Sequence, residues 1–238
     1  VSDYRDYTFM WMDDSWRSTK NKNACIQTGY YGLYIDTIYG QITNMGAIEN
    51  PVTETEAFKQ DSTVIKSLPE AAMKYTATID GVEYFSNVGV VAPAGRSTTI
   101  RVLESGHYLQ SMDLMYLSYL KNTDLKGRLE IKALPSQFAL HYSLYSEKQV
   151  SGVGLSFSIT LDPRYTKHEF SSDGRAITIT ADKGDGFTFV MPSYGNMKIE
   201  YQDNTVKFIA SDLTLEANAF SGFGVVCIPS IAASLEDA

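Results

Sequence analysis

Histidine and cysteine are scarce in this sequence, which has three histidines and two cysteines among 238 residues. His107, His141 and His168 are far apart and show no HxH or HExxH spacing, so neither a metal site nor a cofactor is predicted. Cys25 and Cys227 leave two alternatives open. They form either one disulfide that closes a loop of about 200 residues or two buried free thiols.

Long apolar runs and clusters of basic residues are also missing. No run approaches the roughly 18–20 apolar residues that span a bilayer, so no membrane insertion is expected. The basic residues are scattered in a chain of net charge −8, which argues against nucleic acid as a partner. The sequence begins at Val1 without a basic and apolar leader. We expect a processed chain that is secreted or on the cell surface, with a cytoplasmic chain as the alternative.

Motifs of the common nucleophilic and phosphate-binding sites are absent as well. There is no GxSxG nucleophile elbow. The stretch GVVAPAGRS (89–97) has five residues between its glycines instead of the four of a P-loop, so we interpret it as a loop. Helix signals are weak, and the best candidate, 53–68, is rich in β-branched residues and is followed by Pro69.

What the sequence has in abundance is a two-residue periodicity. In VGLSFSITL (153–161) apolar residues alternate with glycine, serine and threonine, so one face of the strand is apolar and the other small and polar. RLEIKAL (128–134) and FALHYSLY (138–145) alternate likewise, and His141 falls on the face opposite the apolar one. Further strands are predicted at 74–79, 176–180, 187–191, 198–201, 205–209 and 212–217.

Turn signals separate these strands at the spacing of antiparallel hairpins. Four dipeptides suit turns that need positive φ: Asp80-Gly81, Asp173-Gly174, Asp185-Gly186 and Asp203-Asn204. The pattern predicts an all-β fold, a large antiparallel β-sandwich with little helix and about fourteen to sixteen strands. No linker or composition shift divides the chain. We therefore expect one domain over 1–238, with an N-terminal strand and polar turn in 1–22 and a tail in 229–238.

The N-terminal stretch YTFMWMDDSWR (7–17) contains both tryptophans of the protein. Its first half is apolar on both faces, which is typical of a strand covered on both sides, so Trp11 is predicted to be core. Its second half places two carboxylates, an indole and a guanidinium at the end of that strand. An ion pair between Arg17 and Asp13 or Asp14 would explain these residues as a structural turn.

Carboxylates near predicted strand ends are the weak candidates for catalysis. Glycosidases place two acids on opposite sides of a sugar bond. In a chain with 28 acidic residues many lie near strand ends by chance, so no role is assigned to any of them. The acids so placed are Asp13, Asp14, Glu104, Asp113 and Asp162, and an autonomous enzyme would most plausibly use Asp13, Asp14, His107 or Asp113.

Aromatic residues in polar settings are the candidates for carbohydrate binding. An exposed ring stacks on the apolar face of a pyranose, while neighbouring polar groups hydrogen-bond its hydroxyls. The alternative is that tyrosine is simply a good strand residue with a solvated hydroxyl. The candidate residues are Trp16 and Arg17 in DDSWRS, Tyr30 and Tyr31 between two glycines, and Tyr194 in PSYGN.

Three stretches carry a resemblance to a known family. IQTGYYGLYIDTIYGQITNMGAI (26–48), RVLESGHYLQSMDL (101–114) and LKGRLEIKALPSQFALHYSL (125–144) resemble the sandwich domains of bacterial carbohydrate-active enzymes. The fold that this implies is the super-sandwich of galactose mutarotase-like proteins, and the biology that it implies is carbohydrate-related. The mutarotase pattern of a catalytic histidine pair with a glutamate base is not found here, so the resemblance implies that a partner domain or chain supplies the acids.

Two hypotheses follow from the sequence. The first is a carbohydrate-active β-sandwich domain or subunit that binds glycan and is part of a glycoside hydrolase, with a further catalytic domain or chain as partner. The second is a non-catalytic structural or assembly protein, such as a surface-layer, capsid or appendage subunit, which is a homo-oligomer. Glycan affinity and oligomeric state distinguish the two.

Overall fold

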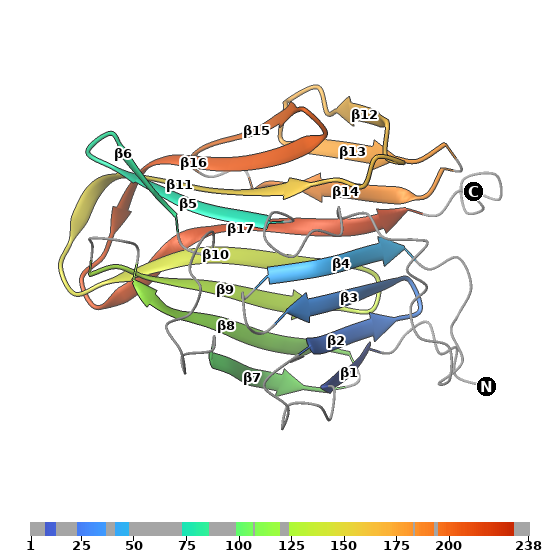
Figure 1. The fold of residues 1–238 in the computed structure, drawn as a ribbon, viewed down its shortest axis with the longest axis horizontal. Helices are drawn as coiled ribbons and strands as arrows, with labels where there is room; N and C mark the ends of the chain where they lie inside the picture. The colour runs from blue at the N-terminus through green and yellow to red at the C-terminus, as the bar shows by residue number, and fades with distance from the viewer. Residues whose placement is uncertain are drawn as a thin grey trace.

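The computed structural model of the protein describes residues 8–12, 23–36, 41–47, 73–85, 99–106, 108–119, 124–182, 184–192 and 195–230. Within these ranges all the regular elements are β-strands, and the paired strands form three antiparallel sheets (Figure 1). The prediction of an antiparallel all-β fold is therefore confirmed. The candidate helix at 53–68 lies outside the described residues.

The largest sheet has eight strands in the order β12-β13-β14-β17-β10-β9-β8-β7. Their bounds are β7 Thr99–Ser105, β8 Gln110–Tyr119, β9 Lys126–Ala133, β10 Phe138–Ser146, β12 Lys167–Phe170, β13 Ala176–Thr180, β14 Gly186–Val190 and β17 Ala219–Ser230. β17 follows all the other strands that the structure describes but pairs with β10 on one side and β14 on the other. It therefore joins two groups of hairpin strands into one sheet.

Two smaller sheets complete the fold. A five-stranded sheet has the order β15-β16-β11-β5-β6, and a four-stranded sheet has the order β1-β2-β3-β4. Their bounds are β1 Thr8–Met12, β2 Asn23–Thr28, β3 Tyr31–Asp36, β4 Gln41–Ala47, β5 Met73–Ile79, β6 Val82–Phe85, β11 Val150–Thr160, β15 Asn196–Gln202 and β16 Thr205–Leu215.

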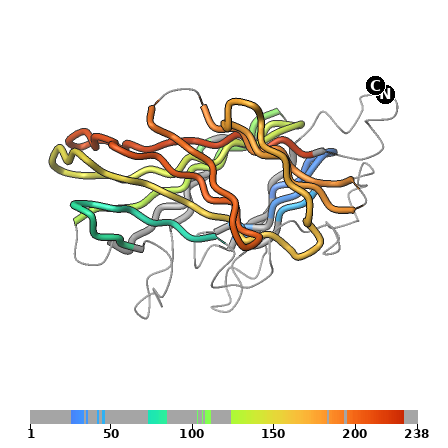
Figure 2. Tube along the Cα trace, turned by 90° about the horizontal axis from the view of Figure 1, so that it is seen from above, coloured from blue at the N-terminus to red at the C-terminus, as the bar shows by residue number. Residues whose placement is uncertain are grey.

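The eight-stranded sheet forms one layer, and the two smaller sheets together form the other (Figure 2). Aromatic pairs join the eight- and five-stranded sheets: the rings of Tyr75 and Tyr142 lie 5.2 Å apart, and those of Phe157 and Phe223 stack at 5.6 Å. The four-stranded sheet packs on the same layer, where the Tyr31 ring lies 5.0 Å from Phe138. Such aromatic burial supplies much of the free energy that holds sandwich layers together.

The strand predictions agree with the structure except where local backbone geometry intervenes. The run 176–180 coincides with β13. The runs 205–209 and 212–217 were expected to be separate strands, but 205–215 form the single strand β16. Asp212, inside β16, has φ of 55°. The two-residue periodicity is interrupted at this local irregularity, although the strand continues through it.

The turn predictions hold at three of the four dipeptides. Gly81 and Gly174 have positive φ, as do Asp203 and Asn204. The prediction at Asp185-Gly186 is wrong, because Gly186 already begins β14 and the chain reverses before it, with Gly184 at φ of 91°. A Cβ atom on Gly186 would overlap the carbonyl oxygen of Ile179 on the paired strand, so this glycine serves close strand approach instead of a turn.

Candidate functional site

The structure reaches only part of the predicted site. Asp113 lies in β8, where the backbone register places it between Arg101 of β7 and Glu130 of β9. Its proposed catalytic role is not tested by this position. Six further candidates lie outside the described residues, and their assignments stay predictions: Asp13, Asp14, Trp16, Arg17, His107 and Tyr194.

Tyr31 is a core residue and presents no ring face to a ligand. Its side chain is 0% exposed, and its hydroxyl donates to the carbonyl oxygens of Leu134 at 2.6 Å and Gln137 at 3.0 Å. Burial holds the pKa of the Tyr31 hydroxyl well above its ordinary value. Tyr30 is partly buried and packs against the same core. The tandem tyrosines thus anchor the four-stranded sheet, which corrects the surface placement expected for Tyr31.

Cys227 is a buried free thiol in β17. Burial raises the pKa of this thiol well above its ordinary value, so it stays protonated and unreactive at neutral pH. Of the two alternatives for the cysteines, the structure agrees with the buried free thiol at this position. Cys25 lies in β2, and its side chain is outside the described part of the chain.

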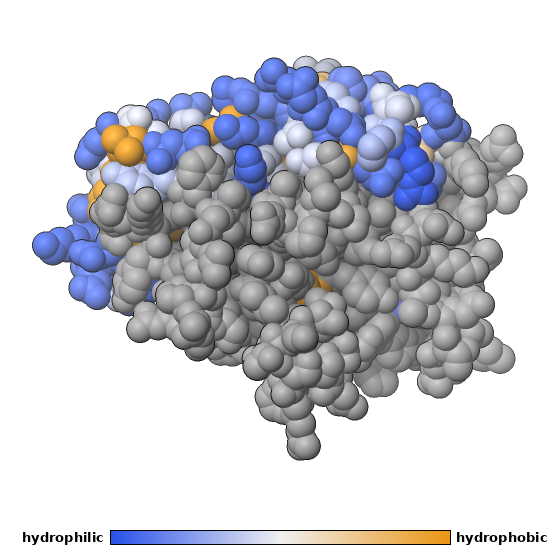
Figure 3. Space-filling view, viewed as in Figure 1, coloured by the Kyte–Doolittle hydropathy of each residue, from blue (hydrophilic) through white to orange (hydrophobic). Residues whose placement is uncertain are grey.

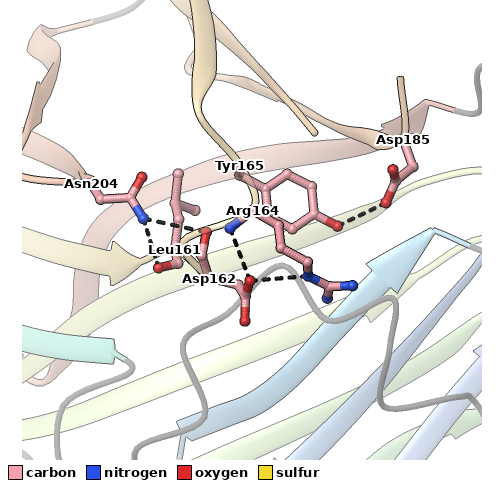
Figure 4. Close-up of polar contacts among 6 residues, drawn as sticks. All are labelled: Leu161, Asp162, Arg164, Tyr165, Asp185 and Asn204. Atoms are coloured by element: carbon pink, nitrogen blue, oxygen red, sulfur yellow. Dashed lines mark hydrogen bonds and ion pairs between the residues drawn. The ribbon is translucent and has the colours of Figure 1, made fainter. Parts of the chain in front are cut away.

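A polar cluster lies at the turn that follows β11 (Figure 4). Asp162 was among the acids near strand ends, and its Oδ1 accepts hydrogen bonds from the Arg164 backbone N–H and Nε, both at 3.0 Å. The Asn204 amide nitrogen donates to the carbonyl oxygens of Leu161 at 2.9 Å and Asp162 at 3.3 Å. The cluster therefore ties the β11–β12 turn to the β15–β16 turn, a structural role for these polar groups.

The same turn is also tied to the eight-stranded sheet. The Tyr165 side chain is 1% exposed, and its hydroxyl donates to Oδ2 of Asp185 at 3.0 Å (Figure 4). Burial, reinforced by the charge and hydrogen bond of Asp185, raises the pKa of Tyr165 above its ordinary value. Tyr165 is thus held protonated as a donor. We call the residues of Figure 4 the turn clamp: Leu161, Asp162, Arg164, Tyr165, Asp185 and Asn204.

The outer face of the eight-stranded sheet carries a second polar cluster. Buried residues alternate with partly exposed ones along β9 and β10, so one face packs on the other layer and the opposite face carries polar groups. We call this polar surface the outer face. Its central residues are Lys126, Arg128, Glu130 and Lys132 of β9, His141, Ser143 and Tyr145 of β10, and Phe220, Gly222 and Gly224 of β17.

Charged groups on the outer face are held in fixed positions. The Glu130 carboxylate lies 3.1 Å from Nζ of Lys132 and 3.8 Å from a guanidinium nitrogen of Arg128. The Arg128 guanidinium lies 4.0 Å from the centre of the Phe220 ring, and its Nε donates to Oγ of Ser143 at 3.3 Å. These contacts orient Glu130 beside His141, its cross-strand neighbour in the register.

His141 is the least satisfied polar side chain of this surface. Its Nδ1 is buried and has no hydrogen-bond partner, a state that costs free energy when no ligand or solvent atom compensates it. Burial lowers the pKa of His141, the charges of Arg128 and Lys132 lower it further, and Glu130 opposes them. The imidazole is therefore neutral at pH 7, with one nitrogen that donates and one that accepts hydrogen bonds.

Sequence reasoning placed His141 on the outer face but not beside Glu130. The alternation in RLEIKAL and FALHYSLY assigns each residue to a face of its own strand. Only the register, in which His141 lies between Glu130 and Gly224, brings the three together. A search for polar residues on the solvent faces of neighbouring strands would have found this cluster.

Neither a metal-binding cluster nor a membrane-crossing helix is found among the residues that the structure describes. These residues hold no group of three or more His, Cys, Asp or Glu side chains arranged to bind a metal ion. Among them, no helix has the length and apolar character that crossing a membrane requires.

Comparison with known proteins shows the fold. No family model matches the sequence, and no curated protein matches it. The structure is similar to a candidate aldose 1-epimerase of Escherichia coli K12, with a TM-score of 0.50 and 6% identity over 94% of this chain and 99% of that one. It is equally similar to a galactose mutarotase related enzyme of Lactobacillus acidophilus, at a TM-score of 0.50 and 9% identity, covering 88% and 98% of the two chains.

These similarities confirm the fold class implied by the sequence, a β-sandwich resembling that of the galactose mutarotase-like proteins. Heparan sulfate lyase HepC of Pedobacter heparinus also aligns, with a TM-score of 0.48 and 12% identity. That alignment covers 96% of this chain but 36% of the lyase, so the chain spans about a third of its length.

Proposed function

We propose that this chain is a glycan-binding β-sandwich domain or subunit of a carbohydrate-active protein, with its binding surface on the outer face. The observation that carries the proposal is the partly exposed imidazole of His141 beside the oriented carboxylate of Glu130, its cross-strand neighbour. The likeness to mutarotase-like sandwiches supports it at the level of fold alone.

The chemistry of the outer face suits sugar hydroxyls. A neutral imidazole both donates and accepts, a carboxylate accepts, and an ammonium donates, so neighbouring hydroxyls of one ring meet complementary groups. Gly224 lies beside His141 without a side chain, and a Cβ there would contact His141 Cδ2 at 3.4 Å. The sheet surface next to the imidazole is therefore low enough for a flat ligand to approach.

Calorimetric titration with a panel of oligosaccharides tests this proposal. His141→Ala should weaken the affinity for the bound glycan at least tenfold, and Glu130→Gln should weaken it in the same direction. Lys74→Ala is the control, because Lys74 is exposed on β5, in the other layer. Wild-type affinity in His141→Ala, confirmed as folded by circular dichroism, would refute the outer face as the site.

Catalysis by a partner domain or chain is part of the proposal. The mutarotase pattern of a catalytic histidine pair with a glutamate base is not found in the sequence, so the partner would supply the catalytic acids. Trp16, Arg17 and Tyr194 stay proposed sugar contacts, and Trp16→Ala tests the first of them by the same titration. Secretion or surface location is likewise proposed, and fractionation of the producing cells tests it.

Light scattering after size-exclusion chromatography distinguishes the assembly alternative. A monomer or small oligomer with glycan affinity supports the carbohydrate-binding proposal. A large symmetric oligomer that binds no glycan favours a structural subunit instead.

A further inference from the structure

β15 is the least protected edge strand among the residues that the structure describes. It ends the five-stranded sheet, near the top of the molecule in Figure 1. Edge strands are usually short or interrupted by bulges, because their unpaired N–H and C=O groups offer a pairing site to another chain. Of the other described edges, β6 and β12 have four residues each, β1 has five, and β4 and β7 have register shifts against their neighbours. β15 has seven residues without a proline, and it pairs with β16 without a shift.

The two ends of β15 are tied to neighbouring elements. At one end the Asn196 amide nitrogen donates to Oδ2 of Asp212 at 3.3 Å. At the other end the Tyr201 hydroxyl donates to Oδ1 of Asn204 at 3.0 Å, and the Tyr201 ring stacks on His168 of β12 with centroids 3.9 Å apart. The strand is therefore already ordered, and pairing with another chain costs little additional conformational entropy.

The sequence of β15, NMKIEYQ, has a symmetric arrangement about Ile199. Residues at equal distances from this centre carry complementary groups: Lys198 and Glu200, then Met197 and Tyr201, then Asn196 and Gln202. The two charged residues form an ion pair along the strand, and their side chains are 61% and 47% exposed. Their charges cancel, so the edge does not repel a second copy of itself.

An antiparallel pair of two β15 strands centred on Ile199 places each Lys198 opposite Glu200 of the other copy. Opposite charges directly across two strands stabilise the pairing, and like charges there destabilise it. If the centre moved by one residue in either direction, Lys198 would lie opposite its own copy, or Glu200 would. The charges therefore select the register that is centred on Ile199.

The remaining side chains fit the same register. Met197 lies opposite Tyr201 of the other copy, a contact between a thioether and an aromatic ring. Asn196 lies opposite Gln202, and two amides form hydrogen bonds with each other. The described residues along the top of the molecule, where β15 lies, are mainly hydrophilic (Figure 3). Backbone hydrogen bonds and charge pairs, instead of an apolar patch, would thus hold the two copies together.

We propose that β15 is a dimerisation edge, where two copies of this chain pair antiparallel through Asn196–Gln202 with Ile199 at the centre. The pairing joins their two five-stranded sheets into one continuous sheet. Each chain has one β15, so the assembly closes at a dimer with a twofold axis perpendicular to the sheet. Such an axis leaves the outer faces of both copies on the same side of the dimer. The inference is independent of what the outer face binds.

Sedimentation equilibrium of charge variants tests the dimer and its register. Lys198→Glu should weaken dimerisation about tenfold or more, because it places like charges opposite each other in both cross-strand pairs. Glu200→Lys should weaken it in the same way. An equimolar mixture of the two variants should recover the wild-type affinity as a heterodimer, because every cross-strand pair is again of opposite charge. The double variant K198E/E200K should also dimerise.

Lys74→Glu is the matched control, because it makes the same charge change at an exposed residue of β5, inside the same sheet. It should dimerise as the wild type does. Urea unfolding of each variant verifies that the fold is intact. The mixing experiment separates a lost cross-strand pair from a lost ion pair within β15, since neither single variant has the ion pair.

Four results would overturn the proposal. A wild-type chain that stays monomeric up to about 100 μM has no dimerisation edge of useful strength. A wild-type assembly larger than a dimer contradicts the closed twofold pairing. A dimer that Lys198→Glu leaves at full affinity uses another surface, and single variants that are weakened but do not recover on mixing contradict the register. None of these results bears on the outer face, which the glycan titration of the His141 variant tests separately.

Discussion

Tyr31 shows how one hydroxyl group fastens two sheets together. It reaches from β3 of the four-stranded sheet to the turn between β9 and β10, where it donates to two carbonyl oxygens. A tyrosine that is 0% exposed normally needs such acceptors, because a buried hydroxyl without them is costly. The contact explains why a polar side chain is tolerated in this part of the core.

Replacing Tyr31 with phenylalanine should lower the free energy of unfolding by about 1–2 kcal/mol, because both carbonyl oxygens lose their donor while the ring packing stays. Urea denaturation followed by circular dichroism measures this change. Tyr30→Phe is the control and should cost less than about 0.5 kcal/mol. Equal losses in the two variants would show that the Tyr31 hydroxyl contributes nothing specific.

At the scale of single residues, the sequence did not predict which of two neighbouring tyrosines is buried. GYYG (29–32) predicted exposed tyrosines, because two glycines and two hydroxyls resemble a polar loop. In the structure Tyr31 begins β3 and its ring enters the core. The direction of a side chain at a strand start depends on the turn before it, here shaped by Thr28, whose Oγ1 accepts the N–H groups of both tyrosines.

At the scale of elements, the turns between strands carry specific conformations. Asp203 and Asn204 have φ of 49° and 57°, the left-handed pair of a two-residue hairpin turn between β15 and β16. Asn204 has a second task, since its side chain bonds the turn after β11. One residue thus sets a hairpin and positions a neighbouring turn.

Asn204→Gly and Asn204→Ala should separate these two tasks. Glycine keeps the positive φ and loses the side-chain bonds, so we expect a loss of about 1–2 kcal/mol. Alanine loses the bonds and also strains the backbone, which adds about 1 kcal/mol. Thermal and urea unfolding of both variants measure the difference. Asp203→Gly is the control and should cost nothing, and a similar loss there would contradict a specific role for the Asn204 amide.

Strand existence was predictable because alternation records which face is buried. β9, β10, β11 and β13 all lie where two-residue periodicity placed them. Strand pairing was not predictable for strands far apart in the chain. β10 and β17 pair with each other, but the sequence of neither strand specifies its partner. Glu130 and His141 pair across the β9–β10 hairpin, and the periodicity assigned each of them correctly to a face but did not give the register that matches them.

At the scale of the whole molecule, several buried acids are neutral in the folded state. Burial raises the pKa values of Cys227, Tyr31 and Tyr165. The folded protein keeps protons that the unfolded chain releases above about pH 8.5 for cysteine and about pH 10 for tyrosine. Stability from these groups is therefore complete below the unfolded pKa values and is lost as the pH rises toward the folded ones.

We expect the free energy of unfolding to fall above about pH 8.5 and more steeply above about pH 10. Each group contributes a slope of up to about 1.4 kcal/mol per pH unit. Urea midpoints measured from pH 7 to 11 test this dependence. Tyr165→Phe should flatten the curve above about pH 10 without changing it near pH 9. Cys227→Ala should flatten the curve between about pH 8.5 and pH 10. A stability that stays constant to pH 11 would contradict the protonated burial of all three.

The layered architecture followed from the sequence only in outline. Alternating strands in a chain of this length predicted a large sandwich. Division of the second layer into a five- and a four-stranded sheet was not predicted, because it depends on which strand edges pair. The structure assigns β4 and β5 to different sheets although they are consecutive strands in the element order.

The central position of β17 determines when the protein can finish folding. The strands before it form two groups, β7 to β10 and β12 to β14, that share no pairing until residues 219–230 enter between them. During synthesis the largest sheet therefore stays open, with the edges of β10 and β14 exposed, until Ser230 leaves the ribosome. Such late long-range pairing slows folding and leaves unpaired edges that favour aggregation. We therefore expect the nascent chain to depend on chaperones until β17 is free to pair.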